Sequence, residues 1–552
     1  MSNISPLNPW ERFMGLLQIE KKDILQIGYY AIFSGFLALT LPLGIQAIIN
    51  LIQGAQISTS WVVLVILVTV GVAFTGTLQL MQLRIIETIQ QRIFTRASFE
   101  LSYRFPKIKT EALRSYYPPE LANRFFDTLI IQKGLSKILI DVPAALLQIL
   151  FALILLSLYH PFFIVFGFML VILIYTVFKF TAVKGLESSL EESKHKYKVA
   201  HWIQEIARSV VSFKLSGKTQ LALNKNDMLV KDYLNAREKH FKILVIQFIQ
   251  MIGFKVIVTA GLLLIGGTLV LNQEMNIGQF VAAEIIILLI ISSVEKLILG
   301  LESFYDVLTS LEKLGQVVDK ELETQVGDVL PTTHPFNLNL KEVSYSVSDR
   351  KEPILHKINI DIPPYSRVLI KGESGSGKSS LLRLIAGIID PTAGFVNVND
   401  SSVKSLHLNS YRSLLGLSLS EETPFEGTIK ENVSFGNTDI TDKRIKEVFT
   451  DIGLIDFLAE QINGLNTYLK PEGKQISYTI SKKIILARAI LKSPKVLILE
   501  DPIDQFSKEE SQIIIDYLTN AKQTWSLVVV SSNVLWEKAC SQIITLENGK
   551  IK

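Results

Sequence analysis

The chain has 552 residues, of which 48% are hydrophobic and 20% are charged, and its mean hydropathy is +0.33. This composition excludes a disordered chain, which needs low hydrophobicity and high net charge. The 56 Lys and Arg residues nearly balance the 52 Asp and Glu residues, so the charge does not indicate a nucleic-acid partner. A single cysteine, Cys540, excludes a disulfide framework and a cysteine-rich metal site. These values indicate a membrane protein with a soluble part attached.

Six apolar runs before residue 300 are candidates for membrane spans, because about 20 residues at 1.5 Å each cross about 30 Å of hydrocarbon. They cover residues 24–49, 61–81, 142–158, 162–178, 243–271 and 277–291. Only Tyr159, His160 and Pro161 separate the third run from the fourth. We therefore expect these two spans to form a helical hairpin with almost no exposed loop.

The positions of the cations predict the topology. Residues 50–60 carry no charge, and residues 272–276 carry only Glu274, whereas residues 82–141 and 184–242 are rich in Lys and Arg. Since cytoplasmic loops carry the excess of Lys and Arg, we expect a multi-pass protein of the cytoplasmic (inner) membrane. Both termini are then cytoplasmic.

The two basic inner segments are too long to be structureless connectors. Apolar residues in them recur at helical spacing, as in Ile86, Ile89 and Ile93. We expect the membrane helices to continue into the cytoplasm and fold back, with residues 116–119, Tyr-Tyr-Pro-Pro, breaking the first near its tip. At the start of the chain, Trp10 and Phe13 predict a short amphipathic helix at the membrane interface. The alternative for that start is a poorly ordered tail.

The soluble part contains a phosphate-binding loop. The β-type run 368–370 leads into Gly-Glu-Ser-Gly-Ser-Gly-Lys-Ser at 372–379, and the helical pattern 381–385 follows. Strand, G-x-x-x-x-G-K-S and helix in this order form a nucleotide phosphate loop. The glycines let backbone N–H groups face the phosphates at a helix N-terminus. Lys378 would reach the β- and γ-phosphates, and the Ser379 hydroxyl would bind Mg²⁺.

A second apolar run, 495–499, ends at Glu500 and Asp501. A strand that delivers a carboxylate beside a phosphate loop supplies the Mg²⁺ side of a P-loop nucleotidase. Taken alone, such a strand is more often structural, but it follows a complete phosphate loop here. We therefore expect Glu500 to bind Mg²⁺.

At this point the chain resembles the ATP-binding cassette (ABC) exporters, in the half-transporter form with six membrane helices before one nucleotide-binding domain. The residues that carry the resemblance are 486–491, 496–501 and 424–432, which follow the order and spacing of the family. The membrane half is most similar to the exporters of type I secretion, which move proteins or toxins out of Gram-negative bacteria. We expect it to lack the N-terminal peptidase-like domain that many of those exporters carry.

Several family positions depart from the pattern. Val347 stands at the place of the aromatic residue that stacks on adenine, with Tyr345 two positions away. Ser420 replaces the glutamine that touches Mg²⁺ and the attacking water, and Ser532 replaces the switch histidine. The signature Leu-Ser-Gly-Gly-Gln reads Ile-Ser-Tyr-Thr-Ile at 476–480, so only Ser477 is kept. The family has Asp followed by Glu at the end of this strand, whereas this chain has Glu500 followed by Asp501. The Asp-loop region of the family, at 504–507 here, is hard to recognise.

The resemblance implies a fold, a site and cofactors. The fold is an α-helical six-span transmembrane domain with long cytoplasmic extensions over residues 1–320, a linker over 321–335, and an α/β P-loop cassette domain over 336–552. The cofactors are ATP and Mg²⁺, with Ser379 and Glu500 as metal ligands and with Lys378 and Asp501 as catalytic residues. The ATP-binding residues are Gly372, Glu373, Ser374, Gly375, Ser376, Gly377, Lys378, Ser379, Ser380, Tyr345, Val347 and Ser477.

The departures predict slow hydrolysis. Asp501 is one methylene shorter than the family's glutamate, and a misplacement of about 1 Å can cost on the order of a hundredfold in rate. In the family, two cassettes sandwich two ATP molecules, and the signature glycines let a helix N-terminus approach the γ-phosphate of the opposite site. Tyr478 and Thr479 obstruct that approach, so a homodimer would have two impaired sites. Binding without efficient turnover is the expectation.

Three functions remain open. The first is an ATP-driven exporter subunit that hydrolyses ATP, with polypeptide as the cargo that the subfamily resemblance implies. The second is a catalytically weak half that serves as partner or ATP-gated scaffold for a competent subunit. The third is a membrane-anchored P-loop protein of another class, against which the ordered family motifs count. The implied partners are a second half-transporter in a homodimer or heterodimer, membrane lipids, a periplasmic adaptor and an outer-membrane channel.

Charged residues inside the spans are costly and indicate function by default. Lys255 either contacts Glu295, which lies at a similar depth on the next span, or extends to the inner interface. Glu284 is the better candidate for lining the path of the transported substrate. The alternative is that Glu284 is a structural acid held by hydrogen bonds.

Overall fold

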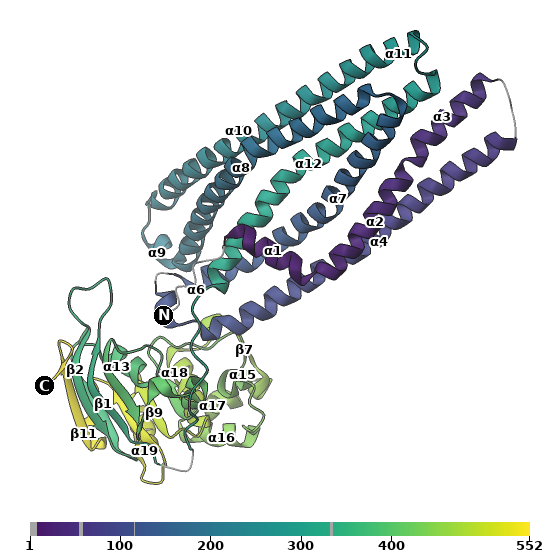
Figure 1. The fold of residues 1–552 in the computed structure, drawn as a ribbon. Coiled ribbons are helices and arrows are strands. Elements are labelled where there is room, and N and C mark those ends of the chain that lie inside the picture. The colour runs from purple at the N-terminus through teal and green to yellow at the C-terminus, as the bar shows by residue number, and fades with distance from the viewer. Residues whose placement is uncertain (1–7, 55–58, 115, 332–334) are drawn as a thin grey trace. The chain divides into compact units, whose positions relative to one another are not determined.

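The computed structural model describes residues 8–54, 59–114, 116–331 and 335–552. The chain divides into two compact units (Figure 1). The first contains residues up to Pro106 together with Ser115–Lys320, and the second contains Lys107–Arg114 and Glu321–Lys552. The short segment Lys107–Arg114 thus clusters with the cassette, although the sequence places it among the membrane helices.

The first unit is entirely helical over its described residues. Its helices are α1 (Pro9–Ile19), α2 (Lys21–Ala38), α3 (Thr40–Gln53), α4 (Thr59–Arg104), α6 (Pro118–Ala122), α7 (Asp127–Tyr159), α8 (Phe162–Arg208), α9 (Val210–Leu215), α10 (Leu221–Gly261), α11 (Gly267–Leu271) and α12 (Ile277–Val318), with a π-helical turn at Leu262–Gly266. Within the described residues, six helical segments are long and apolar enough to cross a membrane. The predicted six-span architecture is confirmed.

The long helices confirm that the spans continue beyond the bilayer. The 47 residues of α8 extend about 70 Å at 1.5 Å per residue, more than twice the thickness of the hydrocarbon core. The hairpin between α7 and α8 is also confirmed, with His160 and Pro161 between the two helices. At the start of the chain, α1 is a capped helix rather than a tail, and the Asn8 side chain accepts a hydrogen bond from the Trp10 N–H.

One span has a local break, and one expectation was wrong in detail. The run 24–49 lies within a single candidate span, Lys21–Gln53, in which Leu39 separates α2 from α3. Pro42 lies in the first turn of α3, where its missing N–H costs no intrahelical hydrogen bond. The first inner helix ends at Arg104, before the Tyr-Tyr-Pro-Pro run, and Pro118 instead occupies the first turn of α6. Proline is favoured at this first position because its fixed φ suits a helix start.

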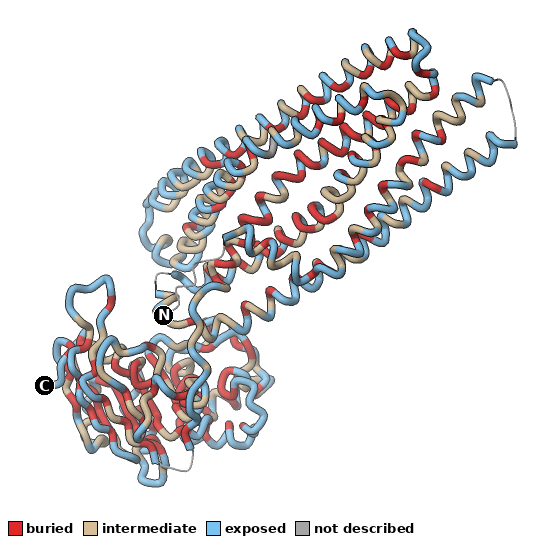
Figure 2. Tube along the Cα trace, in the orientation of Figure 1, coloured by how far each residue is buried: buried red, intermediate tan, exposed pale blue. Residues whose placement is uncertain are grey.

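The core of the first unit lies along α7 and α12, and Figure 2 shows buried positions following α12 along much of its length. Glycines let the helices approach closely. A Cβ atom on Gly185 of α8 would lie 2.4 Å from the Tyr305 ring of α12. A Cβ atom on Gly134 of α7 would lie 2.4 Å from the Val307 side chain. Close packing of this kind is typical of small residues at helix interfaces in membranes.

The second unit is an α/β domain with two main sheets. Four strands, β1 (Leu338–Tyr345), β2 (Leu355–Ile362), β4 (Ala393–Val398) and β5 (Ser401–Ser402), form an antiparallel sheet in the order β2-β1-β4-β5. The other sheet has the order β12-β11-β3-β10-β9-β6, and all its pairings are parallel except that of β12. Its strands are β3 (Arg367–Lys371), β6 (Leu415–Ser418), β9 (Val496–Glu500), β10 (Ser526–Val530), β11 (Gln542–Glu547) and β12 (Lys550–Ile551).

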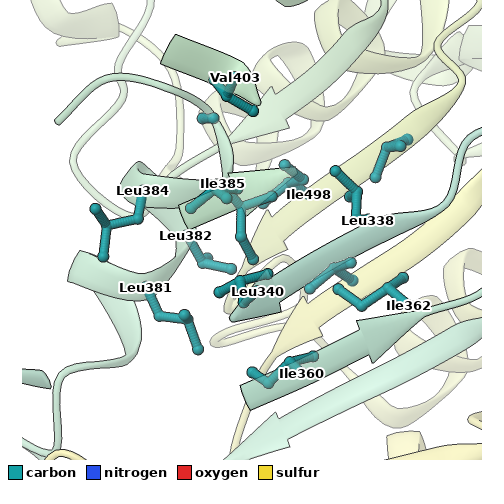
Figure 3. Close-up of a cluster of buried hydrophobic side chains, with 14 of the residues drawn as sticks. Leu338, Leu340, Ile360, Ile362, Leu381, Leu382, Leu384, Ile385, Val403 and Ile498 are labelled. Atoms are coloured by element: carbon teal, nitrogen blue, oxygen red, sulfur yellow. The ribbon is translucent and has the colours of Figure 1, made fainter. Parts of the chain in front are cut away.

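A buried apolar cluster joins the two sheets through helix α13 (Lys378–Ile385). Leu381, Leu382 and Ile385 of α13 are less than 1% exposed and pack with Leu338 and Ile360 of the antiparallel sheet (Figure 3). Helices α15 (Ile429–Ser434), α16 (Asp442–Asp451), α18 (Tyr478–Leu491) and α19 (Lys508–Thr519) build a second apolar cluster with the parallel strands. The short α5 (Thr110–Leu113), α14 (Leu408–Ser413), α17 (Ile455–Ala459), α20 (Leu535–Ala539) and the strand pair β7 (Gly427–Thr428) and β8 (Tyr468–Leu469) complete the unit.

Candidate functional site

The phosphate loop connects β3 to α13, as the sequence predicts. β3 ends at Lys371, and α13 begins at Lys378. Gly377 caps the helix with φ +101°, and a Cβ atom there would lie 2.7 Å from the Leu355 side chain. Only glycine adopts this backbone conformation without strain. The loop therefore depends on its glycine both for conformation and for space.

Lys378 lies within the curve of this loop. Its ammonium donates hydrogen bonds to the carbonyl oxygens of Gly372 at 2.8 Å and Glu373 at 2.7 Å. These carbonyls hold the ammonium beside the loop N–H groups, where a negatively charged phosphate would be attracted. The arrangement matches the phosphate-binding role expected of the loop.

Glu500 lies at the carboxyl end of β9 and is 6% exposed. One of its carboxylate oxygens accepts a hydrogen bond from the Ser379 hydroxyl. The other accepts two from Ser420, from the N–H at 3.1 Å and from the hydroxyl at 2.9 Å. Burial alone would raise the pKa of Glu500, but these hydrogen bonds hold it below its ordinary value.

The structure thus brings Ser379 and Glu500 into direct contact, from segments 121 residues apart in the sequence. Hydroxyl and carboxylate oxygens are the ligands that Mg²⁺ prefers, and Mg²⁺ is commonly held by one or two carboxylates together with substrate phosphates. The residues present therefore fit a bound Mg²⁺. Its chemistry there would be to neutralise the charge of the phosphates.

Asp501 adopts a left-handed backbone conformation with φ +43°. Its N–H donates a hydrogen bond to the Val530 carbonyl at 2.8 Å, which fixes the chain immediately after β9. Burial, and to a lesser extent the neighbouring charge of Glu500, raise the pKa of Asp501, although a hydrogen bond with Ser531 opposes the shift. The acid pair therefore has two different environments, which favour ionised Glu500 and disfavour ionised Asp501.

These residues surround a cleft of about 570 Å³. Most of the predicted ATP-binding residues line it, together with both acids: Gly372, Ser374, Gly375, Gly377, Lys378, Ser379, Ser380, Glu500 and Asp501. Ser376 is buried at 5% exposure, and Glu373 contributes its carbonyl to Lys378 rather than lining the cleft. Ser531 and Ser532 complete the wall on the side of β10.

The base-side residues differ from the expectation. Val347 is 7% exposed, and Tyr345 packs against the apolar cluster of the antiparallel sheet, so neither lines the cleft. The β1–β2 loop instead contributes Arg350 and Ile354, and Arg114 adds a second guanidinium that pairs with Asp349 at 3.1 Å. The motifs do not reveal these residues, because the path of the β1–β2 loop determines which side chains face the cleft.

The degenerate signature lies at the start of α18. Ser477 caps this helix, and its hydroxyl accepts a hydrogen bond from the Ile480 N–H at 3.3 Å. The Tyr478 side chain is 44% exposed beside it, and the Tyr478 hydroxyl donates to Asp504 at 3.4 Å. A phenol ring therefore stands where the family has a glycine without a side chain.

A buried lysine links this helix to the acid pair. Lys482 of α18 is 4% exposed, and its ammonium donates to the Ser420 carbonyl at 2.9 Å. Ser420 in turn binds Glu500. Burial lowers the pKa of Lys482, while the charges of Glu500 and its acidic neighbours oppose this shift. The motifs do not reveal this residue, although the consecutive lysines 482 and 483 just before the apolar run 484–487 were a visible signal.

Comparisons with known proteins agree with this architecture. The model of the ABC transporter family matches residues 355–504, and that of the ABC transporter transmembrane region matches 24–294. The chain is 24% identical over 373 residues to a putative export ATP-binding/permease protein of Rickettsia bellii, covering 67% of this chain and 64% of that protein. It is 26% identical over 314 residues to the leukotoxin export ATP-binding protein LtxB of Aggregatibacter actinomycetemcomitans, covering 56% and 44%.

A further relative is the multidrug resistance protein sirA of Leptosphaeria maculans, 27% identical over 293 residues that cover 52% of this chain and 23% of that protein. The chain thus spans less than two thirds of the length of these curated relatives. The solved structure of a bacterial Atm1-family ABC exporter with ATP bound has the same fold, with a TM-score of 0.86, 15% identity, and coverage of 96% of this chain and 94% of that one. With a transmembrane region followed by one cassette, in the half-transporter arrangement, this chain belongs to the ATP-binding cassette transporters.

Proposed function

We propose that this chain is a subunit of an ATP-driven exporter that binds Mg-ATP in the cleft around residues 372–380. The observation that carries the proposal is the contact of the Ser379 hydroxyl with Glu500 beside the ammonium of Lys378. The oxygens of Ser379 and Glu500 can bind a cation, and the Lys378 ammonium can bind phosphate. Together in one cleft, they suit a nucleotide triphosphate with its metal.

The proposed setting is a dimer in the cytoplasmic membrane, with both termini in the cytoplasm. The turn at residues 272–276 carries only Glu274, whereas residues 184–242 are rich in Lys and Arg, and cytoplasmic segments carry the excess of cations. Proteins similar to this chain include the leukotoxin export ATP-binding protein LtxB and an ATP-dependent lipid A-core flippase. The first of these names agrees with a polypeptide cargo, for which a periplasmic adaptor and an outer-membrane channel would be the further partners.

A second candidate function is a catalytically weak half that binds ATP and depends on a competent partner subunit. Two observations favour it over rapid hydrolysis by this chain alone. Asp501 has a strained backbone, and burial disfavours its ionised form. The exposed ring of Tyr478 occupies the helix start that would approach the nucleotide of the opposite site. Removal of one stabilising group from a transition state typically costs about a hundred- to a thousandfold in rate.

The deciding experiment measures ATP binding and ATP turnover by the purified full-length protein in lipid. Lys378→Ala should abolish nucleotide binding, whereas Lys404→Ala, an exposed lysine of the same unit, should leave it unchanged. Steady turnover that Lys378→Ala removes would support a self-sufficient exporter. Tight Mg-ATP binding without turnover would support the second candidate, and unchanged affinity in Lys378→Ala would overturn the site.

A further inference from the structure

A second polar cavity lies within the transmembrane unit, at the end of the long helices that leads toward residue 320. It measures about 560 Å³ and is formed by residues from α6, α8, α10 and α12 and from the turn before α7. Basic side chains dominate its wall: Arg124, Lys194, Lys198, His201, Lys225 and Lys313. Only two acids, Glu120 and Glu205, line the same cavity.

Both acids are already paired. Glu205 accepts two hydrogen bonds from Arg208, at 3.0 and 2.7 Å. Glu120 lies 3.1 Å from the His201 ring and 3.4 Å from one terminal nitrogen of Arg124. The remaining lysines of the wall therefore give the cavity an excess of positive charge, and a confined excess of one sign attracts ions of the other.

Two of the cations are buried without sufficient partners. Arg124 is 6% exposed, its guanidinium stacks 3.6 Å from the centre of the Tyr197 ring, and its Nε and Nη1 atoms have no hydrogen-bond partner. Lys313 is 8% exposed, its ammonium lies 5.5 Å from the centre of the same Tyr197 ring, and the charges of Asp127 and Glu312 also act on it. The buried Asp127 accepts a hydrogen bond from the Tyr197 hydroxyl, and its charge interacts with both cations without a direct ion pair. Since burying an unpaired charge is costly, the cavity is suited to an anion.

The position of the cavity favours a soluble ion over a lipid headgroup as that anion. From Phe162, where α8 begins, Lys194 lies about 48 Å along the helix, and from Ile277, Lys313 lies about 54 Å along α12, at 1.5 Å per residue. A bilayer with its headgroups is about 40–45 Å thick. For helices perpendicular to the membrane, the cavity lies beyond the headgroups, and its volume is within the range that holds a small molecule.

From this geometry we infer that the transmembrane unit binds a small soluble polyanion carrying phosphoryl or carboxylate groups, held by Arg124 and Lys313 and enclosed by Lys194, Lys198 and Lys225. The site is separate from the nucleotide cleft and uses none of its residues. Arg124 lines the cavity, and its two unpartnered nitrogens, Nε and Nη1, are donors of the kind that bind the oxygens of a phosphate or carboxylate. Both nitrogens are buried, so an anion reaches them only with a local movement of the wall. Tyr197 fixes the guanidinium by stacking.

The test is calorimetric titration of pyrophosphate into the full-length protein in phosphatidylcholine nanodiscs. The protein carries Lys378→Ala, so that the nucleotide cleft does not contribute. We expect one site per chain with a dissociation constant below about 1 mM. Arg124→Gln should weaken binding at least tenfold, and so should Lys198→Glu, whose exposed position avoids a folding defect. Lys231→Met, an exposed lysine of α10 outside the cavity, is the matched control.

Absence of binding, or equal affinity in Arg124→Gln, Lys198→Glu and Lys231→Met, would overturn the inference. A second titration with citrate assigns the class: binding of citrate with the same variant pattern supports carboxylate recognition, and binding of pyrophosphate alone supports phosphoryl recognition. In nanodiscs with phosphatidylglycerol, unchanged pyrophosphate affinity supports a soluble ligand, whereas competition by the lipid would overturn it. Because Lys378→Ala is present throughout, failure here leaves the proposed nucleotide function untouched.

Discussion

Ser420 donates two hydrogen bonds to the same carboxylate oxygen of Glu500, from its N–H at 3.1 Å and from its hydroxyl at 2.9 Å. The family's glutamine at this place reaches toward the metal and the attacking water, but the shorter serine binds the acid instead. Ser379 binds the other oxygen of Glu500, so the carboxylate is held from both sides. The cleft is thus well ordered for binding a metal and poorly equipped for positioning water.

Lys482 should weaken Mg²⁺ binding at this carboxylate. Its buried ammonium binds the Ser420 carbonyl at 2.9 Å and interacts electrostatically with Glu500 and Asp501. Replacing it in Lys482→Met removes a positive charge that competes with the metal in a low-dielectric setting. We expect the Mg²⁺ concentration for half-maximal ATP binding to fall several-fold. The exposed Lys474→Met is the control, and an unchanged or higher Mg²⁺ requirement in Lys482→Met would contradict the prediction.

Asp501→Glu should raise ATP turnover, because the longer side chain restores the reach that the family's second acid has. The hydrogen bond from the Asp501 N–H to the Val530 carbonyl is a backbone contact that this substitution keeps. Turnover by the full-length protein in lipid is the measurement, and Asp501→Asn, which cannot act as a base, should give no gain. If Asp501→Glu also gives none, the limiting residues are Ser420, Ser532 or the signature.

Cys540, the single cysteine, should report on unfolding of the cassette. Burial raises the pKa of its thiol to about 11, although Arg367 opposes the shift. Since only the thiolate reacts, a rise from the ordinary value near 9 to 11 makes alkylation at pH 8 about a hundredfold slower in the folded protein. Mass spectrometry after iodoacetamide treatment measures this rate. Equal rates with and without denaturant would contradict the assignment.

The sequence predicted the spans and the phosphate loop because both signals are local. Helical periodicity shows that the helices continue past the membrane, and the glycine, lysine and serine of the loop stand in consecutive positions. Lys255 and Glu295 could also be matched by depth, and the structure confirms their ion pair at 3.3 Å. Glu284, by contrast, is exposed on α12, and its role in a path stays a prediction.

The missed features depend on tertiary contacts. The Lys482–Ser420–Glu500 chain exists because β6 and β9 are parallel neighbours and α18 packs on them, which no single segment encodes. Arg350 and Ile354 line the cleft whereas Tyr345 and Val347 do not, and this difference follows from the path of one loop. The end of α4 at Arg104 was misplaced because a proline pair can start a helix as readily as it stops one.

Gly185→Ala should destabilise the transmembrane unit, because the added methyl group would lie 2.4 Å from the Tyr305 ring. Tyr305 is 1% exposed, and its hydroxyl accepts a hydrogen bond from Gln247 at 3.1 Å, so the ring has little room to move. Overpacking of this kind costs about 1–3 kcal/mol. The matched control is Gly300→Ala on α12, where nothing lies within 4 Å of the added Cβ atom, and where alanine should stabilise the helix by up to about 1 kcal/mol. Thermal unfolding in detergent should therefore show a lower Tm for Gly185→Ala and an equal or higher Tm for Gly300→Ala, whereas the same shift in both variants would mean that the contact of Gly185 with Tyr305 does not limit the packing of α8 on α12.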